Sequence, residues 1–219
     1  MKLFLSSAGL KPEFKEDFFK LLGKDPKQCK VAFIATAADP EPSKAFVKWS
    51  TDQIEEVGMS WYEVDLKGKD KADLRIELAP ADIIWVNGGN TFYLLDHARK
   101  SGFDKVVKEL LFDGKLYYGV SAGSYLVCPT IEAARWKRLD DRNVVHMTDF
   151  TSLGLVDFLI IAHYEEKWRE AVENGVKSTD LPVAVLTDQQ AVMIDDDKIK
   201  IVGDGSKLLF NGFEEKFDK

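Results

Sequence analysis

The chain has 219 residues, of which 45% are hydrophobic and 31% are charged, the balance of a folded globular protein rather than a disordered one. Its formal net charge of −7 argues against nucleic acid as a partner, because phosphate binding needs a basic face. No apolar run approaches the roughly 18 residues of a membrane span, so no membrane partner is expected.

The N-terminus and the cysteines favour a cytoplasmic protein. The apolar run at residues 3–5 is too short for a signal peptide, and Pro12 and Glu13 follow almost at once. Cys29 and Cys128 have neither the spacing of metal ligands nor that of a disulfide framework. We therefore expect both thiols to be packing groups in a reducing compartment.

Apolar runs of strand length alternate with segments of helical spacing over residues 1–120. The expected strands cover residues 2–6, 31–35, 61–66, 83–86 and 116–120. The expected helices cover residues 12–22, 43–57, 91–100 and 103–112, with 74–78 as a short connecting segment. The alternation predicts a mostly parallel sheet flanked by helices, a three-layer α/β sandwich. Right-handed crossovers then place the loops after the strands along one edge, where such sheets bind ligands.

Shorter apolar segments make up the rest of the chain. Residues 153–161 are expected to be strand-like and 165–176 helical. Short strands are expected at residues 183–186, 192–194, 198–202 and 208–210. These strands predict an antiparallel extension of the sheet. Because no linker, repeat or low-complexity segment interrupts the sequence, we expect a single domain over residues 1–219.

Residues 116–126 have the layout of a nucleophile elbow. An apolar run ends in Gly119-Val-Ser121-Ala-Gly123, and a second run of helical character follows. In such an elbow a strand stops, the chain turns sharply, and the serine at the apex has strained backbone and an exposed hydroxyl. Glycine at both flanking positions would remove Cβ atoms that collide where strand and helix approach closely. The alternative is an ordinary strand-to-helix turn with Ser121 as the helix N-cap.

A second loop of small residues, 87–90 (Asn-Gly-Gly-Asn), follows the strand expected at 83–86. By itself this loop is typical of a tight turn. Together with the elbow it predicts a two-sided oxyanion hole, in which Gly89 or Gly88 donates one backbone N–H and Ala122 donates the other.

A serine nucleophile needs a base, and the chain has only three histidines. His97 lies in the middle of an expected helix, and His146 lies among polar loop residues. His163 follows the strand-like stretch that ends near residue 161, which places it on the same edge as Ser121. His163 is therefore the expected base, although a lone histidine of this kind is often structural.

Three motifs keep the order and approximate spacing of a known family. They are Val86-Asn-Gly-Gly-Asn-Thr-Phe-Tyr-Leu-Leu95, then Tyr118-Gly-Val-Ser-Ala-Gly-Ser124 followed by Cys128-Pro-Thr-Ile131, and finally Gly154-Leu-Val-Asp-Phe158 leading to His163-Tyr164. They resemble the peptidase E family of serine peptidases, to which the cyanophycinases are related, and the match covers most of the chain.

The resemblance implies a class I glutamine amidotransferase-like, flavodoxin-like fold and a serine-peptidase reaction. It makes Ser121 the nucleophile, His163 the base, and the amides of Gly89 (or Gly88) and Ala122 the oxyanion hole. Ser121 would attack a peptide carbonyl while His163 takes its proton, and water would resolve the acyl-enzyme. This chemistry requires no cofactor and no metal.

The acid that orients the base is where the chain departs from the family's pattern. In the aspartyl dipeptidases an Asp lies a short way past the elbow helix, and the matching position here is Trp136. Other members use a Glu, so Glu132, the nearest acidic residue, is the predicted third member of the triad. The alternatives are Asp140, Asp141, Asp157 and Glu165.

The family's dipeptidases cleave after an N-terminal aspartate, so the resemblance implies a short peptide substrate with that preference. Recognising the aspartate side chain would need a cation near the edge of the sheet. The available cations are Arg135, Lys137, Arg138, Lys167 and Arg169. Arg135 and Asn90 are predicted to bind substrate, and the protein is expected to be a monomer or a homodimer.

Two other functions fit the same sequence. One is a hydrolase on this scaffold that acts on another amide or ester, and the other is a non-catalytic binding protein in which Ser121 caps a helix and His163 is packed. Glutamine amidotransfer is disfavoured because that chemistry uses a cysteine at the elbow apex. Cys128 lies about two helical turns further along the chain.

Overall fold

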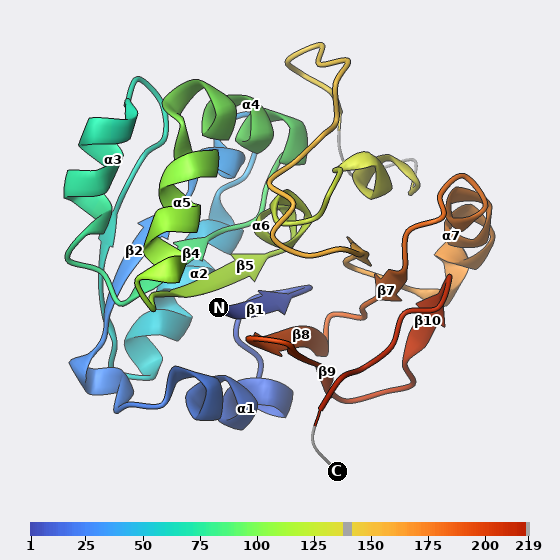
Figure 1. The fold of residues 1–219 in the computed structure, drawn as a ribbon, viewed down its shortest axis with the longest axis horizontal. Helices are drawn as coiled ribbons and strands as arrows, with labels where there is room; N and C mark the ends of the chain where they lie inside the picture. The colour runs from blue at the N-terminus through green and yellow to red at the C-terminus, as the bar shows by residue number, and fades with distance from the viewer. Residues whose placement is uncertain (138–141, 218–219) are drawn as a thin grey trace.

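The computed structural model describes residues 1–137 and 142–217, and a seven-stranded sheet crosses its middle (Figure 1). The strands that run parallel to one another are β1 (Lys2–Ser6), β2 (Lys30–Ile34), β3 (Ser60–Glu63), β4 (Ile83–Val86) and β5 (Leu116–Val120). Beside β1, β8 (Gln190–Asp195) and β9 (Lys198–Gly203) continue the sheet in the antiparallel sense. The order across the sheet is β3-β2-β4-β5-β1-β8-β9.

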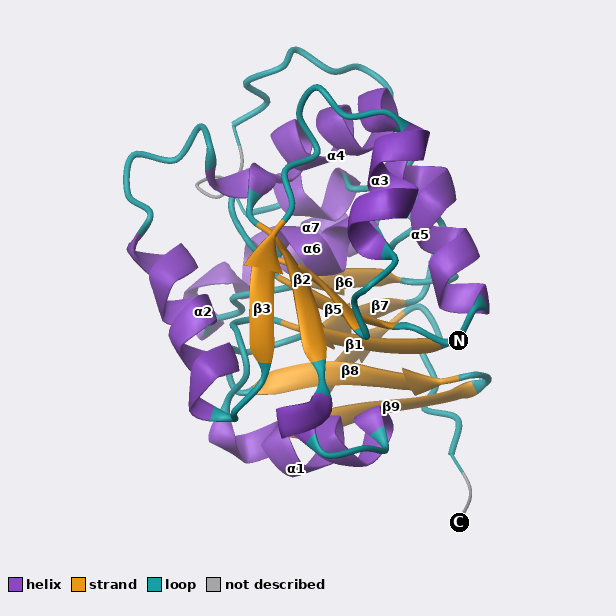
Figure 2. Ribbon diagram, turned by 90° about the vertical axis from the view of Figure 1, so that its left-hand side faces the viewer, coloured by secondary structure: helices purple, strands orange, loops and turns teal. Residues whose placement is uncertain are grey.

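Helices cover both faces of this sheet (Figure 2). One face carries α1 (Pro12–Leu22) and α2 (Ala45–Glu56). The opposite face carries α3 (Lys71–Leu78), α4 (Thr91–Ser101) and α5 (Phe103–Phe112). The predicted α/β class, a mostly parallel sheet between two layers of helices, is confirmed.

Each face of the sheet has its own hydrophobic core. On the α1 face, Phe14 and Phe18 are buried against Phe4, with ring centroids 5.6 and 5.4 Å away. Tyr118 of β5 stacks on Phe4 at 5.3 Å, so the strand that leads to the elbow is fixed by aromatic packing. Burial on both faces explains why the central strands are continuous apolar runs.

The segment 74–78, expected to be a connection, is the second half of α3. The helix begins with a capping box, in which the Asp70 side chain accepts from the backbone N–H groups of Ala72 and Asp73 and the Asp73 side chain accepts from the N–H of Asp70. Leu74 and Leu78 lie one turn apart and are fully buried. The expectation was wrong because it was based on the apolar residues alone, and the capping signal that starts the helix lies upstream of them.

A second, three-stranded sheet lies beyond the carboxyl ends of β1 and β5 (Figure 1). It contains β6 (Leu159–Ile161), β7 (Val183–Val185) and β10 (Leu208–Phe210), with β6 parallel and β10 antiparallel to β7. The predicted strand 208–210 therefore pairs in this sheet, whereas β8 and β9 form the antiparallel extension of the main sheet. The helix α7 (Arg169–Val176), preceded by the short helix η4 (Glu166–Trp168), lies beside it.

The apolar stretch 153–161 is a strand only over its last residues. The backbone of Leu153 and Leu155 instead donates to the carbonyls of Leu126 and Val127, so this part packs as a loop over the end of the short helix α6 (Ala122–Leu126). Three other short helices are η1 (Pro26–Gln28), η2 (Thr36–Ala38) and η3 (Glu132–Arg135). Among the described residues, no helix has the length and apolar character needed to cross a membrane.

Candidate active site

Ser121 lies at the sharp turn between β5 and α6. Its backbone has φ 49° and ψ −106°, a conformation that L-residues rarely adopt. The backbone N–H of Ser121 donates to the carbonyl of Ser6 at 3.0 Å, and its own carbonyl accepts from the N–H groups of Ser124 and Tyr125. The surrounding structure thus holds the strained residue in place from both sides.

The two glycines that flank the serine are required because the backbone around them leaves no room for a Cβ atom. A Cβ on Gly123 would lie 2.1 Å from the carbonyl oxygen of Val86 on the neighbouring strand β4. A Cβ on Gly119 would lie 2.8 Å from the backbone of Gly123. The close approach of strand and helix that these residues predict is therefore present, and no larger residue fits without moving the elbow.

His163 follows β6 and reaches Ser121 from the second sheet. Its Nε2 lies 2.9 Å from Oγ of Ser121. The residue has φ 54°, and its backbone N–H donates to Oγ of Ser7 at 2.7 Å. The buried ammonium of Lys137 donates to the carbonyls of Ala162 at 2.6 Å and of His163 at 3.2 Å. Contacts on both sides of the residue therefore fix this left-handed turn.

Asp188 occupies the other side of the imidazole. Its Oδ1 lies 2.6 Å from Nδ1 of His163, and the same oxygen accepts from the hydroxyl of Ser7 at 2.9 Å. Burial raises the pKa of the Asp188 carboxyl, but hydrogen bonds from His163 and Ser7 outweigh burial and hold the pKa below its ordinary value. Asp188 is therefore ionised near neutral pH.

The turn that carries Asp188 is fixed by its neighbour Gln190. Oε1 of Gln190 accepts from the backbone N–H of Thr187 at 3.1 Å, and the N–H of Gln190 donates to the carbonyl of Thr187 at 3.0 Å. The carbonyl of Gln190 accepts from the N–H of Ser7, which ties this turn to the end of β1. The carboxylate is thus positioned relative to both sheets.

The carboxylate beside His163 is Asp188 and not the predicted Glu132. Glu132 is exposed on η3, where its backbone N–H donates to Oγ1 of Thr130. Among the alternatives, Asp157 is exposed and Glu165 pairs with Lys167 at 2.6 Å. Asp140 and Asp141 lie outside the described residues.

A cavity of about 300 Å³ opens in front of Ser121 and His163. Gly88 and Gly89 line it, and a Cβ on Gly88 would lie 3.3 Å from Cβ of Ser121. Gly89 has φ +133°, and a Cβ there would lie 2.3 Å from the carbonyl oxygen of Ala37. The loop 87–90 therefore lies directly against the elbow, with Ala122 starting the helix on the serine's other side.

The two predicted substrate-binding residues are engaged elsewhere. The side chain of Asn90 is the N-cap of α4, where Oδ1 accepts from the N–H of Tyr93 at 3.0 Å and Nδ2 donates to the carbonyl of Arg142 at 2.9 Å. Arg135 is exposed on η3, and its guanidinium lies over the ring of Phe150, 5.0 Å from the centroid. Neither belongs to the described lining of the cavity.

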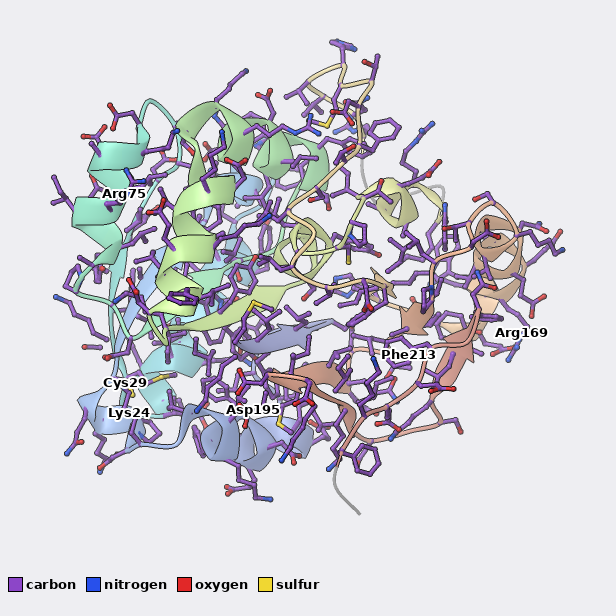
Figure 3. All side chains as sticks on the ribbon, in the orientation of Figure 1. Lys24, Cys29, Arg75, Arg169, Asp195 and Phe213 are labelled. Atoms are coloured by element: carbon purple, nitrogen blue, oxygen red, sulfur yellow. The ribbon has the colours of Figure 1, made fainter. Side chains whose placement is uncertain are left out.

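The other expected cations also have partners away from the serine. Lys137 donates to backbone carbonyls, as described above, and Lys167 pairs with Glu165. Arg169, the first residue of α7, pairs with Glu166 at 3.0 Å and lies on the outer side of the molecule (Figure 3). Arg138 lies outside the described residues.

The remaining histidines and the cysteines lie away from the candidate site. His146 is exposed, and the ring of His97 lies 4.4 Å from that of Tyr93 on α4. Both thiols are free and buried, and burial raises the pKa of Cys128 to about 12, so its thiol stays protonated. In the part of the chain that the structure describes, no group of His, Cys, Asp or Glu is arranged to hold a metal ion.

A strained serine at a strand-to-helix turn, beside an imidazole and a carboxylate, is the arrangement of an α/β serine hydrolase. Comparison with known proteins is more specific. The model of peptidase family S51 matches residues 3–202. The chain therefore belongs to peptidase family S51, the peptidase E family, and is a serine peptidase.

Individual relatives agree with this assignment. An uncharacterized peptidase of Listeria monocytogenes is 34% identical over 165 residues, which are 74% of this chain and 77% of the relative. Another from Pasteurella multocida is 30% identical over 201 residues, 90% of this chain and 94% of the relative. The peptidase E of Shewanella amazonensis is 28% identical over 170 residues, 73% of this chain and 70% of the relative.

Solved structures show the same fold. A crystal structure of a candidate peptidase E protein from Listeria monocytogenes superposes with a TM-score of 0.79 at 27% identity, covering 93% of this chain and 98% of that one. A peptidase from an acI-B1 actinobacterium superposes with a TM-score of 0.74 at 17% identity, covering 98% of this chain and 92% of that one. The second likeness concerns the fold alone.

Proposed function

We propose that Ser121, His163 and Asp188 act as a catalytic triad that hydrolyses short peptides through an acyl-enzyme. Ser121 Oγ attacks the peptide carbonyl carbon while His163 Nε2 takes the hydroxyl proton. His163 then gives that proton to the leaving amine, and the C–N bond breaks. Water attacks the ester in the second half-reaction, again through His163, and the peptide acid leaves. Asp188 stays ionised and holds Nδ1–H toward itself throughout.

The tetrahedral intermediate carries a negative oxygen that needs donors. The backbone N–H groups of Gly88 or Gly89 on one side and of Ala122 on the other are the proposed oxyanion hole. The contact between Gly88 and Ser121 supports this, as does the position of Ala122 at the first turn of α6. Removing one preorganised oxyanion-hole donor from a serine protease costs about 3–4 kcal/mol of transition-state stabilisation.

The observation that carries the proposal is the chain of contacts Ser121–His163–Asp188, with distances of 2.9 and 2.6 Å, at one wall of a cavity. A histidine that merely packs would need neither a strained serine on one nitrogen nor an ionised carboxylate on the other. The relatives named peptidase E support peptide bonds as the substrate class.

A preference for N-terminal aspartate, implied by the family resemblance, has weaker support. Binding an aspartate side chain favours a cation nearby. The described residues that line the cavity include no lysine or arginine. We therefore propose short peptides as the substrates. The preference for aspartate is the part of this function that the lining of the cavity supports least, and the experiment below tests it.

The test is labelling with a fluorophosphonate, followed by hydrolysis of aminoacyl p-nitroanilides. We expect the wild type to be labelled at Ser121 and to release p-nitroaniline, and Ser121→Ala to do neither. Ser206→Ala, at an exposed serine, is the matched control and should behave as wild type. Failure of the wild type to react with the label would indicate a binding protein, and turnover of simple esters without turnover of peptides would indicate another hydrolase.

A further inference from the structure

One wall of the cavity comes from α2 and the turn before it. Phe46 and Trp49 lie on α2 and line the cavity, and the Trp49 residue is 39% exposed. Glu41 lines the same wall and is held by a backbone hydrogen bond from its N–H to the carbonyl of Ala38 at 3.1 Å. Aromatic residues and an acidic residue therefore line the same cavity as the serine.

The residues that line this wall carry one negative charge, and Lys11, which is not among them, lies with its ammonium 4.7 Å from the centroid of the Trp49 ring. Among the described residues that line the cavity, Glu41 is the one carboxylate, and neither lysine nor arginine accompanies it. Within residues 1–137 and 142–217 the Glu41 carboxylate has no ion-pair partner. A carboxylate in the lining of a cavity attracts a positively charged group of a ligand and repels a negatively charged one.

Asn87 adds a neutral donor at the back of the cavity. The residue is 1% exposed, and Oδ1 accepts from the hydroxyl of Ser50 at 2.8 Å. This contact orients the amide and leaves Nδ2 without an acceptor among the described residues. Buried donors are almost always paired in folded proteins, so the Nδ2 of this cavity-lining residue is available to donate to an oxygen of a ligand.

We propose that the cavity selects short peptides with a free N-terminus and an apolar first side chain. The proposal rests on the triad function above and names the substrate class of that site. Glu41 receives the α-ammonium group, the rings of Phe46 and Trp49 pack against the first side chain, and Asn87 Nδ2 donates to a carbonyl oxygen of the peptide. An acidic first residue is disfavoured because its carboxylate would lie near Glu41.

Binding of small amides tests this independently of any bond cleavage. Calorimetry would compare leucinamide, N-acetyl-leucinamide and the α-amide of aspartic acid. We expect leucinamide to bind the wild type about tenfold more tightly than either of the others, the effect of one hydrogen bond to a charged group. Glu41→Gln should remove the advantage over the acetylated compound. Glu16→Gln, the same change at an exposed residue of α1, should leave it intact.

Hydrolysis supplies the second readout. Leu-p-nitroanilide should be cleaved at least about tenfold faster than Asp-p-nitroanilide, judged by kcat/KM, and Glu41→Gln should act mainly through KM. The proposal is overturned if the aspartic amide binds the wild type more tightly than leucinamide, or if Glu41→Gln keeps the preference for the free amine. If the wild type is not labelled by the fluorophosphonate but still binds leucinamide in a way that depends on Glu41, only the triad function is refuted.

Discussion

The hydroxyl of Ser7 links the base to its carboxylate, because it lies 2.9 Å from Oδ1 of Asp188 and 2.7 Å from the backbone nitrogen of His163. Ser7 follows the last residue of β1, and its own N–H donates to the carbonyl of Gln190. One side chain at the end of the main sheet thus orients two residues that come from the second sheet.

Removing this hydroxyl is expected to slow the reaction without blocking it. In Ser7→Ala the N–H of His163 and one lone pair of Asp188 lose their partner, which costs about 1–3 kcal/mol. We expect kcat to fall roughly tenfold or more, with KM changed little, since Ser7 is a positioning residue. Steady-state kinetics would measure the separate effects on kcat and KM, and Ser7→Thr should restore most of kcat. A change confined to thermal stability would show that Ser7 is only structural.

Replacing the carboxylate distinguishes the two candidate acids. Asp188→Asn removes the charge that orients Nδ1 of His163, and the analogous change in other triads lowers kcat by on the order of 10⁴-fold. Glu132→Gln changes an exposed side chain on η3, so we expect activity within about twofold of wild type. The kinetics of both variants, together with their fluorophosphonate labelling rates, would measure this. If Glu132→Gln lost more activity than Asp188→Asn, Glu132 and not Asp188 would be the acid of the triad.

Stability should depend on pH through Asp188. Its folded-state pKa lies below the ordinary value of 3.8, so the ionised carboxylate stabilises the fold above that value and loses the contribution as pH falls through the folded pKa. Urea unfolding of wild type and Asp188→Asn would measure the difference at neutral pH and in the acid range below 3.8. We expect the advantage of the wild type to shrink in acid. An unchanged difference would contradict the pKa shift.

Much of the main sheet is predictable because its strands and helices are marked locally. The bounds of β1, α1, β4 and β5 agree with the sequence prediction, since each apolar run is closed by glycine, proline or polar residues. The elbow is predictable for the same reason, because its Gly-x-Ser-x-Gly pattern is local. Gly119 is forced by a contact with Gly123 in the same strand-turn-helix unit, and Gly123 by a contact with Val86 of the neighbouring strand β4.

Asp188 could not be found that way, because its relation to His163 depends on strand pairing. β6 and β7 lie side by side and parallel, with Ile161 opposite Val185. His163 and Asp188 follow those two residues and so emerge at the same edge. The sequence shows Asp188 only as part of a turn between short apolar runs, which were expected to extend an antiparallel sheet. The parallel pairing was the missing information.

The elbow glycines should tolerate no side chain. Gly123→Ala would place a Cβ 2.1 Å from the carbonyl oxygen of Val86, and we expect a loss of about 3 kcal/mol or more, or failure to fold. Gly68→Ala is the comparison, since Gly68 has φ +68° but no atom within 4 Å of the added carbon. Only the backbone conformation is then strained, which costs about 1–2 kcal/mol. Denaturant unfolding would rank the two, and equal losses would contradict a steric role.

Lys137 is expected to act on the base through its backbone. The residue is 2% exposed, and its ammonium donates to the carbonyls of Ala162 and His163. Lys137→Met keeps the apolar stem but removes the donor, so the left-handed turn at His163 loses a charged hydrogen bond worth about 1.5–3 kcal/mol. We expect kcat and the labelling rate to fall at least about tenfold while KM changes little.

Lys105→Met, at an exposed lysine of α5, is the control for removing a positive charge and should leave both rates unchanged. The decisive comparison is between stability and rate. If Lys137→Met unfolds more easily but keeps the wild-type kcat at a temperature where it is fully folded, the lysine supports only the fold. If kcat and the labelling rate fall together in the folded variant, the conformation of His163 sets the reactivity of Ser121, and the buried lysine maintains that conformation.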